Sequence, residues 1–417
     1  MSYFNKIFLL LGLGFGVVGL ERMVAAFVLP AIQKEFALNY MGAGAIVAIF
    51  GVTWAIGVYV LGSISDYIGR KPVIVLFLIF GGLCSWLSGI AWSFLFLIII
   101  RGIMGFAEGG LWGPITATIA EESRPENRAR NVGFIPGMFL VIGTAIGPIL
   151  SIQLMLHYGW RNVFYIYAIP AVVLGILIWI VMKESPTIQA MLNDRRRGVR
   201  SKRVDAQGKE IKYGDMFKYR NILIFLIVWP IDLAFLYLFT TFGVFYMEKI
   251  HQLPMPVIGL IMSGFGLGGF LGCLVVGSLS DRLGRKKSLI GSFFLCAIVA
   301  YAFASLGLGA SPVAFFALVF FSGFFFAGAG PIVTSSVVET VGFALAASAI
   351  GVVTGVGDLV GGGILPLVGG GLADLMGVKT PLYLASFLMI VSTVCCFLLQ
   401  ETAPKFAKAG LKVEAIS

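Results

Sequence analysis

Twelve stretches of the chain are almost wholly apolar over about 20 residues or more. A helix of that length crosses the ~30 Å hydrocarbon core of a bilayer, where an unpaired backbone amide finds no partner. The pattern therefore predicts an all-α integral membrane protein with twelve transmembrane helices. The expected spans are residues 7–29, 42–64, 72–92, 94–120, 132–156, 163–182, 222–247, 257–279, 288–308, 312–338, 344–371 and 381–399.

The amino-acid composition supports this class. Hydrophobic residues make up 59% of the 417-residue chain and charged residues 12%, whereas an ordinary soluble domain carries about 25% charged residues. The first apolar stretch contains Glu21 and Arg22, and no small-residue cleavage site follows it. We therefore expect a retained helix rather than a signal peptide.

The basic residues predict the orientation of the helices. If both termini face the cytoplasm, all but six of the 30 Lys and Arg residues fall in cytoplasmic loops and tails, as the positive-inside rule requires. Topology and contact with anionic lipids then explain the formal charge of +10, and no nucleic-acid partner is expected. The six exceptions are Lys34, Arg161, Lys249 and Lys379 in exterior loops, with Arg22 and Arg101 inside helices.

One long polar segment, residues 183–221, separates the sixth and seventh spans. It divides the chain into residues 1–182 and 222–400, each expected to form a six-helix bundle, followed by a cytoplasmic tail at 401–417. The segment carries a basic cluster, which is either a regulatory or partner site or, more simply, part of a cytoplasmic linker beside anionic headgroups. The cluster comprises Arg195, Arg196, Arg197, Arg200, Lys202 and Arg203.

A charged turn is repeated at the same place in both halves. "GSISDYIGRK" follows the second span, and "GSLSDRLGRK" follows the eighth. Parallel repeats around a central site are a recurrent plan of transporters. The two turns resemble the signature loops of the major facilitator superfamily, and the resemblance covers essentially the whole chain. The matching residues are Gly62, Asp66, Gly69, Arg70 and Lys71, with Gly277, Asp281, Gly284, Arg285 and Lys286.

The resemblance implies a gating role for these turns. In that family the charged network closes the cytoplasmic side and yields as the two halves rock. The alternative is that the turns only fix topology, since glycine permits a tight reversal and the basic residues suit helix ends and lipid phosphates. A further charged loop, residues 121–130, also resembles the family. Its counterpart near Glu339 has no basic residue, so unequal gating in the two halves is expected.

Six ionisable residues lie within the predicted spans, where each charge costs ~2.5 to 3.5 kcal/mol at a helix centre. Arg101 and Glu108 share one face of a helix, about 10 Å apart along its axis. Glu21 is expected to pair with Arg101, which leaves Arg22 for an anionic substrate. The six residues are Glu21, Arg22, Arg101, Glu108, Asp232 and Asp358.

The same region resembles the anion:cation symporter branch of the family, which carries sugar acids and other organic anions. The similarity lies in "ERMVAAFVLPAIQKEFAL" and in the spacing of "RGIMGFAEGG". It implies that Arg22 binds a substrate carboxylate and that Glu21 and Glu108 exchange protons. The alternative is a buried ion network that only holds the amino-terminal bundle together.

Two carboxylates depart from the pattern of that branch. Asp358 stands where the branch more often has Asn, and Asp232 adds a second acid to the carboxy-terminal half. Four acids against two bases suit an anion only if some acids are protonated. A zwitterion such as an amino acid, or a cationic drug exported against protons, remains open, and "GTAIGPILS" faintly resembles a motif of drug:proton antiporters. Both aspartates are candidates for proton coupling.

Trp54, Tyr237 and Thr354 complete the expected substrate site with Arg22, Arg101 and Asp358, although ordinary packing explains the aromatic residues equally well. No metal site or cofactor is expected, because the two histidines lie in loops without cysteine partners and the five cysteines lie in apolar helices. No grouping of residues indicates an enzyme.

The sequence therefore predicts a secondary transporter, proton-coupled, that moves a small organic anion by rocker-switch alternating access. Its expected partners are a small-molecule substrate, protons and membrane lipids, and it is expected to be a monomer in a bacterial inner membrane. The remote alternative is a non-transporting membrane sensor or scaffold that signals through its basic linker.

Overall fold

The computed structural model describes residues 3–124, 128–184, 189 and 213–407. In this part of the chain all the regular elements are helices. Twelve helical segments, some of them made of two or three consecutive elements, are long and apolar enough to cross a membrane. Each predicted stretch overlaps one of these spans, so the predicted fold class is confirmed. The elements are α1 (Tyr3–Glu35), α2 (Tyr40–Ile68), α3 (Arg70–Gly89), α4 (Phe94–Gly109), α5 (Trp112–Glu122), α6 (Arg128–Met138), η2 (Phe139–Ile146), α7 (Gly147–Tyr158), α8 (Trp160–Val181), η3 (Tyr213–Lys218), α10 (Arg220–Lys249), α11 (Met255–Leu283), α12 (Arg285–Ala304), α13 (Pro312–Val341), α14 (Phe343–Gly357), η4 (Asp358–Ile364), α15 (Leu365–Met376), α16 (Thr380–Phe397) and α17 (Pro404–Ala407).

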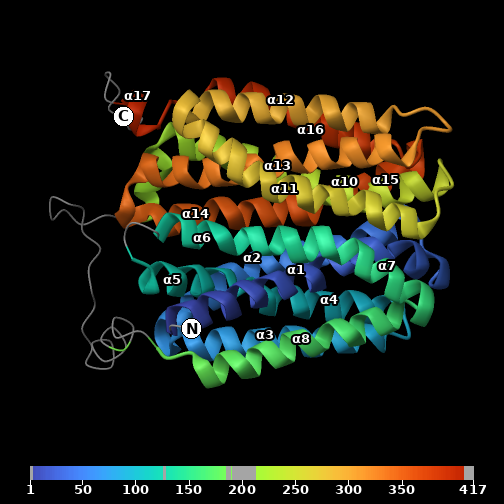
Figure 1. Cartoon of the computed structure of the whole chain (residues 1–417), viewed down its shortest axis with the longest axis horizontal. Helices are drawn as coiled ribbons and strands as arrows, with labels where there is room; N and C mark the ends of the chain where they lie inside the picture. The colour runs from blue at the N-terminus through green and yellow to red at the C-terminus, as the bar shows by residue number, and fades with distance from the viewer. Residues whose placement is uncertain (1–2, 125–127, 185–188, 190–212, 408–417) are drawn as a thin grey trace.

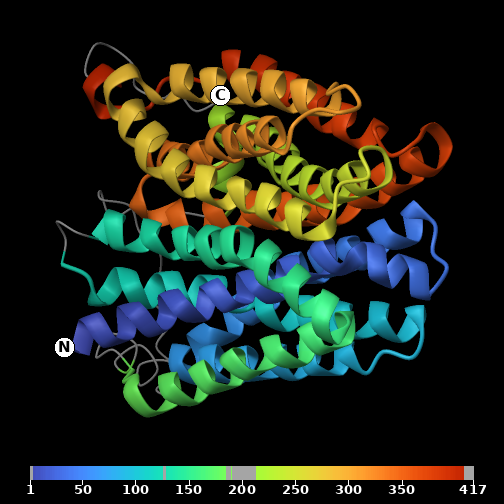
Figure 2. The same cartoon turned by 45° about the vertical axis from the view of Figure 1, so that its right-hand side comes forward.

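The helices lie in two groups that follow the order of the chain. Figures 1 and 2 show α1 to α8 in one group and α10 to α16 in the other, with the long axes of most helices running in the same general direction. The beginning of α1 and the short helix α17 lie at the same end of the molecule. The basic cluster at residues 195–203 lies outside the described residues.

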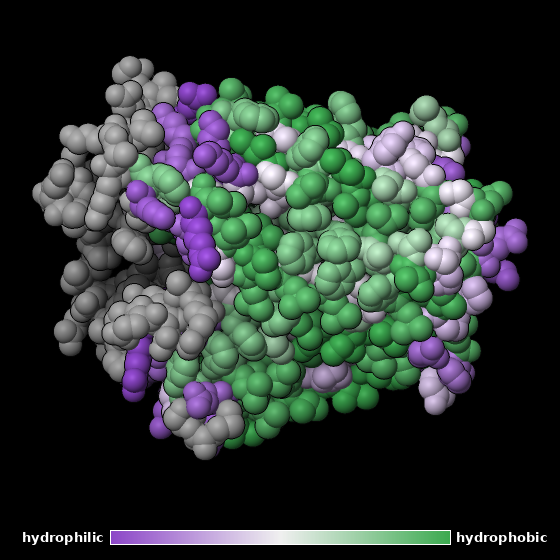
Figure 3. All heavy atoms as spheres, turned by 45° about the horizontal axis from the view of Figure 1, so that its top comes forward, coloured by the Kyte–Doolittle hydropathy of each residue, from purple (hydrophilic) through white to green (hydrophobic). Residues whose placement is uncertain are grey.

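The surface shows where lipid would lie. In Figure 3 a broad apolar belt covers the middle of the molecule, and hydrophilic residues gather toward its two ends. Large hydrophobic side chains are exposed on many helices, among them Trp179, Leu274 and Phe387. An exposed apolar surface of this extent is stable in lipid and would aggregate in water.

Tight turns at glycine connect the helices that carry the repeated motif. Gly69 has φ of 100° between α2 and α3, and Gly284 has φ of 98° between α11 and α12. Only glycine adopts such angles without strain. Gly377 has φ of 94° after α15, three residues beyond Asp374. The same Asp-x-x-Gly spacing thus occurs at a third glycine turn of positive φ, which the sequence analysis did not identify.

Two spans expected to be regular helices contain a wider π-helical turn. These segments, η2 and η4, interrupt the fifth and eleventh spans, which occupy equivalent places in the two halves. A proline stands two residues after the end of each segment, at Pro148 and Pro366. Because π turns shift the register of side chains, they frequently lie at functional sites. Asp358 is the first residue of η4.

Glycines bring the two groups of helices into backbone contact. A methyl group at Gly51 of α2 would collide with the backbone of Gly362 in η4, and one at Gly266 of α11 would collide with the backbone at Ala145 in η2. Small residues allow such close helix packing in lipid. The halves are therefore joined along two seams, α2 with η4 and α15, and α11 with η2 and α7.

The first seam can be tested with Gly51→Ala. An added methyl group in a tight interface costs about 1–3 kcal/mol, so the variant is expected to melt several degrees below the wild type in detergent. Gly351→Ala on α14 is the matched control, because a methyl group there meets no atom within 4 Å. Equal melting temperatures for the wild type and both variants would contradict the close contact at Gly51.

Candidate functional site

The centre of the molecule contains an ion pair that joins the two groups of helices. Arg22 of α1 donates through Nη2 to Oδ1 of Asp358 in η4 over 2.6 Å. The two side chains are 8% and 3% exposed, so the pair is almost completely buried. A buried charge requires such a partner, because leaving it unpaired costs several kcal/mol. The pair thus fixes where α1 and η4 meet.

Aromatic rings surround the guanidinium of Arg22. Its Cζ lies 4.3 Å from the ring centroid of Trp54, 5.2 Å from that of Tyr237 and 5.5 Å from that of Phe50. The faces of aromatic rings attract a cation electrostatically. The structure therefore brings Trp54 and Tyr237, predicted to line the site, together with Arg22 and Asp358.

Arg101 does not pair with the Glu21 carboxylate, so this prediction is wrong. Its Nη1 donates to the backbone carbonyl of Glu21 over 2.8 Å, and its Nη2 donates to the carbonyl of Arg22 over 3.2 Å. The planar fork of a guanidinium fits two successive carbonyl oxygens on one helix. Arg101 therefore positions the α1 backbone, and Arg22, which was expected to be free, has Asp358 as its partner.

Glu21 and Glu108 form a second buried group beside this centre. Both are fully buried, and among the described residues none of their four carboxylate oxygens receives a hydrogen bond. The two carboxyl groups are close enough to interact electrostatically. Ionised carboxylates only accept hydrogen bonds, so a bond between them requires a proton on one of the two.

Among the described residues, neither Thr354 nor Asp232 forms a hydrogen bond or an ion pair with Arg22. Thr354 is one turn before Asp358 and lines a small pocket between α10, α13 and α14 together with Trp229. Asp232 is buried inside the group of helices α10 to α16, where its electrostatic neighbours are Cys273, Cys296 and Cys396. The structure thus separates Asp232 from the central charges.

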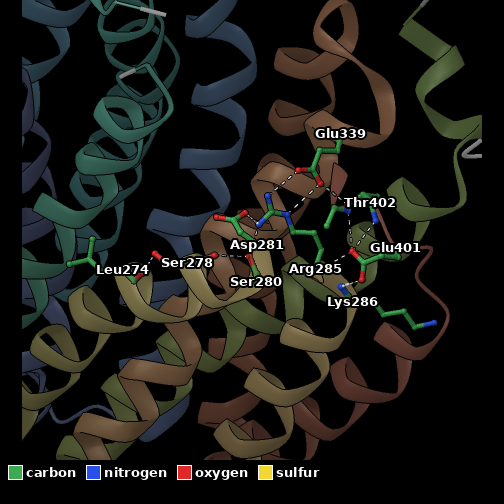
Figure 4. Close-up of polar contacts among 11 residues, drawn as sticks. Leu274, Ser278, Ser280, Asp281, Arg285, Lys286, Glu339, Glu401 and Thr402 are labelled. Atoms are coloured by element: carbon green, nitrogen blue, oxygen red, sulfur yellow. Dashed lines mark hydrogen bonds and ion pairs between the residues drawn. The ribbon is translucent and has the colours of Figure 1, made fainter. Parts of the chain in front are cut away.

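The repeated turns form matching charged networks. Arg70 pairs with Glu121 over 2.7 Å. Arg285 pairs with Asp281 over 2.7 Å and with Glu339 over 3.0 Å (Figure 4). Glu339 therefore pairs with an arginine in its half as Glu121 does in the other. Unequal gating of the two halves stays a prediction. The side chain of Asp66 lies outside the described part of the structure.

Two glutamates that the sequence analysis missed complete these networks. Glu184 accepts from the backbone nitrogen of Lys71 over 2.7 Å, and Glu401 accepts from those of Arg285 and Lys286 over 2.7 and 3.2 Å (Figure 4). Carboxylates stabilise helix N-termini in this way. The signal in the sequence was an acid at the same place after the last span of each half.

Asp374 was also missed, although its spacing to Gly377 repeats that of Asp66 to Gly69. Its carboxylate accepts from the backbone nitrogens of Tyr40 and Met41 over 2.8 and 2.9 Å. It thus caps the N-terminus of α2 from the opposite group of helices. This contact lies at the far end of α2 from Gly69, about 40 Å away along the helix.

A twelve-span helical protein with charged side chains buried between two matched halves has the construction of a membrane transporter. The sequence profile of the Major Facilitator Superfamily matches residues 11–362 and 224–415. The chain therefore belongs to this family, and it is a multi-pass membrane transporter rather than an enzyme. The family predicted from the two turns is confirmed.

Several bacterial transporters are similar in sequence. The chain is 27% identical to the sialic acid transporter NanX of Escherichia coli K12, over 68% of each protein. It is 28% identical to a probable 4-methylmuconolactone transporter of Cupriavidus pinatubonensis, over 84% of this chain and 81% of the relative. It is 26% identical to the niacin transporter NiaP of Acinetobacter baylyi, over 70% of each.

A solved structure has the same fold over almost the full length. It is a bacterial homolog to the human lysosomal transporter Spinster, in an inward-facing and unoccupied conformation. The TM-score is 0.77 with 17% sequence identity, covering 99% of each chain.

Asp374→Asn tests whether the cap on α2 holds the halves together. The amide has one hydrogen-bond acceptor and no negative charge, so the contact at this end is expected to loosen. Spin labels at positions 41 and 376 should then show a longer distance population than in the wild type. Asn39→Ala is the matched control, because Asn39 caps the same helix end through Gly42 without crossing between the halves. Identical distance distributions in the wild type and Asp374→Asn would contradict this role.

Proposed function

We propose that the protein is a proton-coupled symporter of small organic anions that carry a carboxylate. The observation that carries the proposal is the position of Arg22, a buried guanidinium at the junction of the two halves that is already bound to a carboxylate, that of Asp358. A guanidinium in a water-poor site binds carboxylates strongly and with fixed geometry. A substrate carboxylate would bind to the same atoms.

The residues around Arg22 have distinct proposed roles. Trp54, Tyr237 and Phe50 would cover the apolar part of a ligand while its carboxylate contacts Arg22. Arg101 holds the α1 backbone at Arg22 and so fixes the direction of the guanidinium. Thr354 would contact only a ligand that extends toward the pocket beside Trp229.

Protons are proposed to bind at Glu21 and Glu108. Two neighbouring carboxylates without donors are unfavourable in a buried site when both are ionised, and one proton between them removes the repulsion and satisfies both groups. Because this pair lies beside Arg101 and α1, its protonation is able to alter the position of Arg22. The proposal leaves Asp232 out of the coupling group.

Alternating access is proposed from the contact between the halves at one end of the molecule and from the position of the repeated turns at the other. Asp374 joins the halves at one end. At the other end lie the proposed gating residues Gly62, Asp66, Gly69, Arg70, Lys71, Asp281, Gly284 and Arg285. The described ion pairs of these turns, Arg70 with Glu121 and Arg285 with Glu339, lie within each half and do not join the halves. Breaking the Asp374 contact while the repeated turns approach each other at the opposite end would let the halves rock around the central pair, the rocker-switch motion of parallel-repeat transporters.

The relatives support the class of substrate. Sialic acid and niacin, which name two of them, are both carboxylic acids. All three relatives described above come from bacteria. We place this protein in a bacterial inner membrane as a monomer that needs protons and lipids but no cofactor.

A second candidate substrate is a zwitterion. The Arg22–Asp358 pair presents a cation and an anion side by side, so an amino acid could place its carboxylate on Arg22 and its ammonium on Asp358. A purely cationic drug finds less support, because Asp358 is already neutralised by Arg22. The two remaining candidates differ in what they require of Asp358.

Uptake by proteoliposomes tests the proposal. Labelled niacin, sialic acid, benzoate and alanine would be offered with and without an inward proton gradient. At least one carboxylate is expected to accumulate only with the gradient, and Arg22→Ala should reduce its binding by about 100-fold, the loss of a strong charge-assisted contact. Arg161→Ala, which removes an ion pair with Glu35 outside the centre, should transport normally. Carboxylate uptake at the wild-type level in Arg22→Ala would contradict the assignment of Arg22 as the residue that binds the substrate.

A further inference from the structure

Asp358 occupies the binding position that a substrate carboxylate would need. We propose that Asp358 is an internal counter-ion that takes up a proton as it releases Arg22, so that each anion binds together with a proton on this residue. The inference rests on the proposed function. It assigns Asp358 as the group that competes with the substrate for Arg22 and that accepts the proton.

The geometry leaves Arg22 with one anionic partner. Its Nη2 is bound to Asp358, and its Nε has no hydrogen-bond partner among the described residues. Arg101 is committed to the carbonyls of Glu21 and Arg22 and offers no replacement cation at η4. Asp358 therefore depends on Arg22 in the same way that Arg22 depends on Asp358.

The surroundings of Asp358 contain few other charges. The charged and titratable side chains near the pair are Glu21 from α1, Arg101 and Glu108 from α4, and Tyr237 from α10. The side of α2 that faces the pair contributes the aromatic rings of Phe50 and Trp54. No second cation in the described structure pairs with Asp358 once Arg22 has turned to a ligand.

Electrostatics then requires a proton. If a substrate carboxylate took over Arg22 while Asp358 stayed ionised, two carboxylates would compete for one guanidinium, and Asp358 would be a buried charge without a partner. A proton from the aqueous phase that adds to a carboxylate oxygen of Asp358 removes both costs. The hydrogen bond of Arg22 Nη2 passes from Asp358 Oδ1 to the substrate. One O–H bond of hydronium breaks and leaves water as the O–H bond of Asp358 forms, and no other covalent bond changes.

The exchange also changes the contact between the halves. The Arg22–Asp358 pair ties α1 to η4, whereas a site with a bound anion and a protonated Asp358 would have no ion pair across this junction. Binding of the anion would therefore loosen the centre and favour rocking. The anion and its proton together add no net charge to the buried site.

The pH dependence of binding by purified protein tests the inference. Binding of labelled niacin, sialic acid and benzoate would be measured between pH 6 and pH 8 in the wild type, Asp358→Asn, Asp358→Glu and Asp232→Asn. One linked proton weakens binding about tenfold per pH unit. Asp358→Asn should lose this one-proton dependence and bind at least tenfold more tightly at pH 8, because Arg22 is released from its anionic partner.

The control variants separate a proton site from a structural role. Asp358→Glu keeps an acid and should keep the wild-type slope, whereas Asp232→Asn is the same substitution in a buried position away from Arg22 and should bind like the wild type. Melting temperatures show whether each variant folds. If Asp358→Asn retains the wild-type slope, or loses binding at both pH 6 and pH 8, the inference fails while the proposed function stands. If the wild type binds none of the carboxylates at any pH, both fail.

Discussion

The buried ion pair between Arg22 and Asp358 is the interaction on which the rest of the account depends. It brings together residues 336 positions apart in the chain and places opposite charges at the junction of the two groups of helices. In a low-dielectric site neither partner is stable alone. When a ligand binds one partner, the charge of the other must therefore be neutralised. This requirement links substrate binding, proton binding and conformation.

Packing on both sides gives the pair its position. Glycines let α2 approach the backbone of η4 directly, and the π-helical turn of η4 begins at Asp358 itself. On the opposite side, Arg101 holds two carbonyls of α1 next to Arg22. The equivalent π segment η2 packs against α11, so the two seams are related by the repeat of the fold. Similar pairs of contacts recur at the turns, where Glu184 and Glu401 cap α3 and α12.

Much of the fold could be predicted from the sequence because it follows from local patterns. The lengths of the apolar stretches predicted the twelve spans, and the glycine in each charged turn predicted the reversals of the chain at Gly69 and Gly284. The set of buried charges was also predicted, but not their pairing. Arg101 donates to backbone carbonyls, and no pattern of side chains in the sequence indicates such a contact. The partner of Arg22 is Asp358, which lies in the other half of the chain. The ion pair of Glu339 was not predicted, because its basic partner, Arg285, belongs to a different helix. Asp374 was overlooked although its spacing to Gly377 was visible.

Infrared difference spectroscopy tests the central claim most directly, since the C=O stretch of a protonated carboxyl group is distinct from the bands of a carboxylate. The spectrum of the protein with a bound carboxylate substrate, minus that of the empty protein, is predicted to show a new protonated-carboxyl band that is absent in Asp358→Asn. A band of the same intensity in Asp358→Asn, or no band in the wild type, would contradict the account.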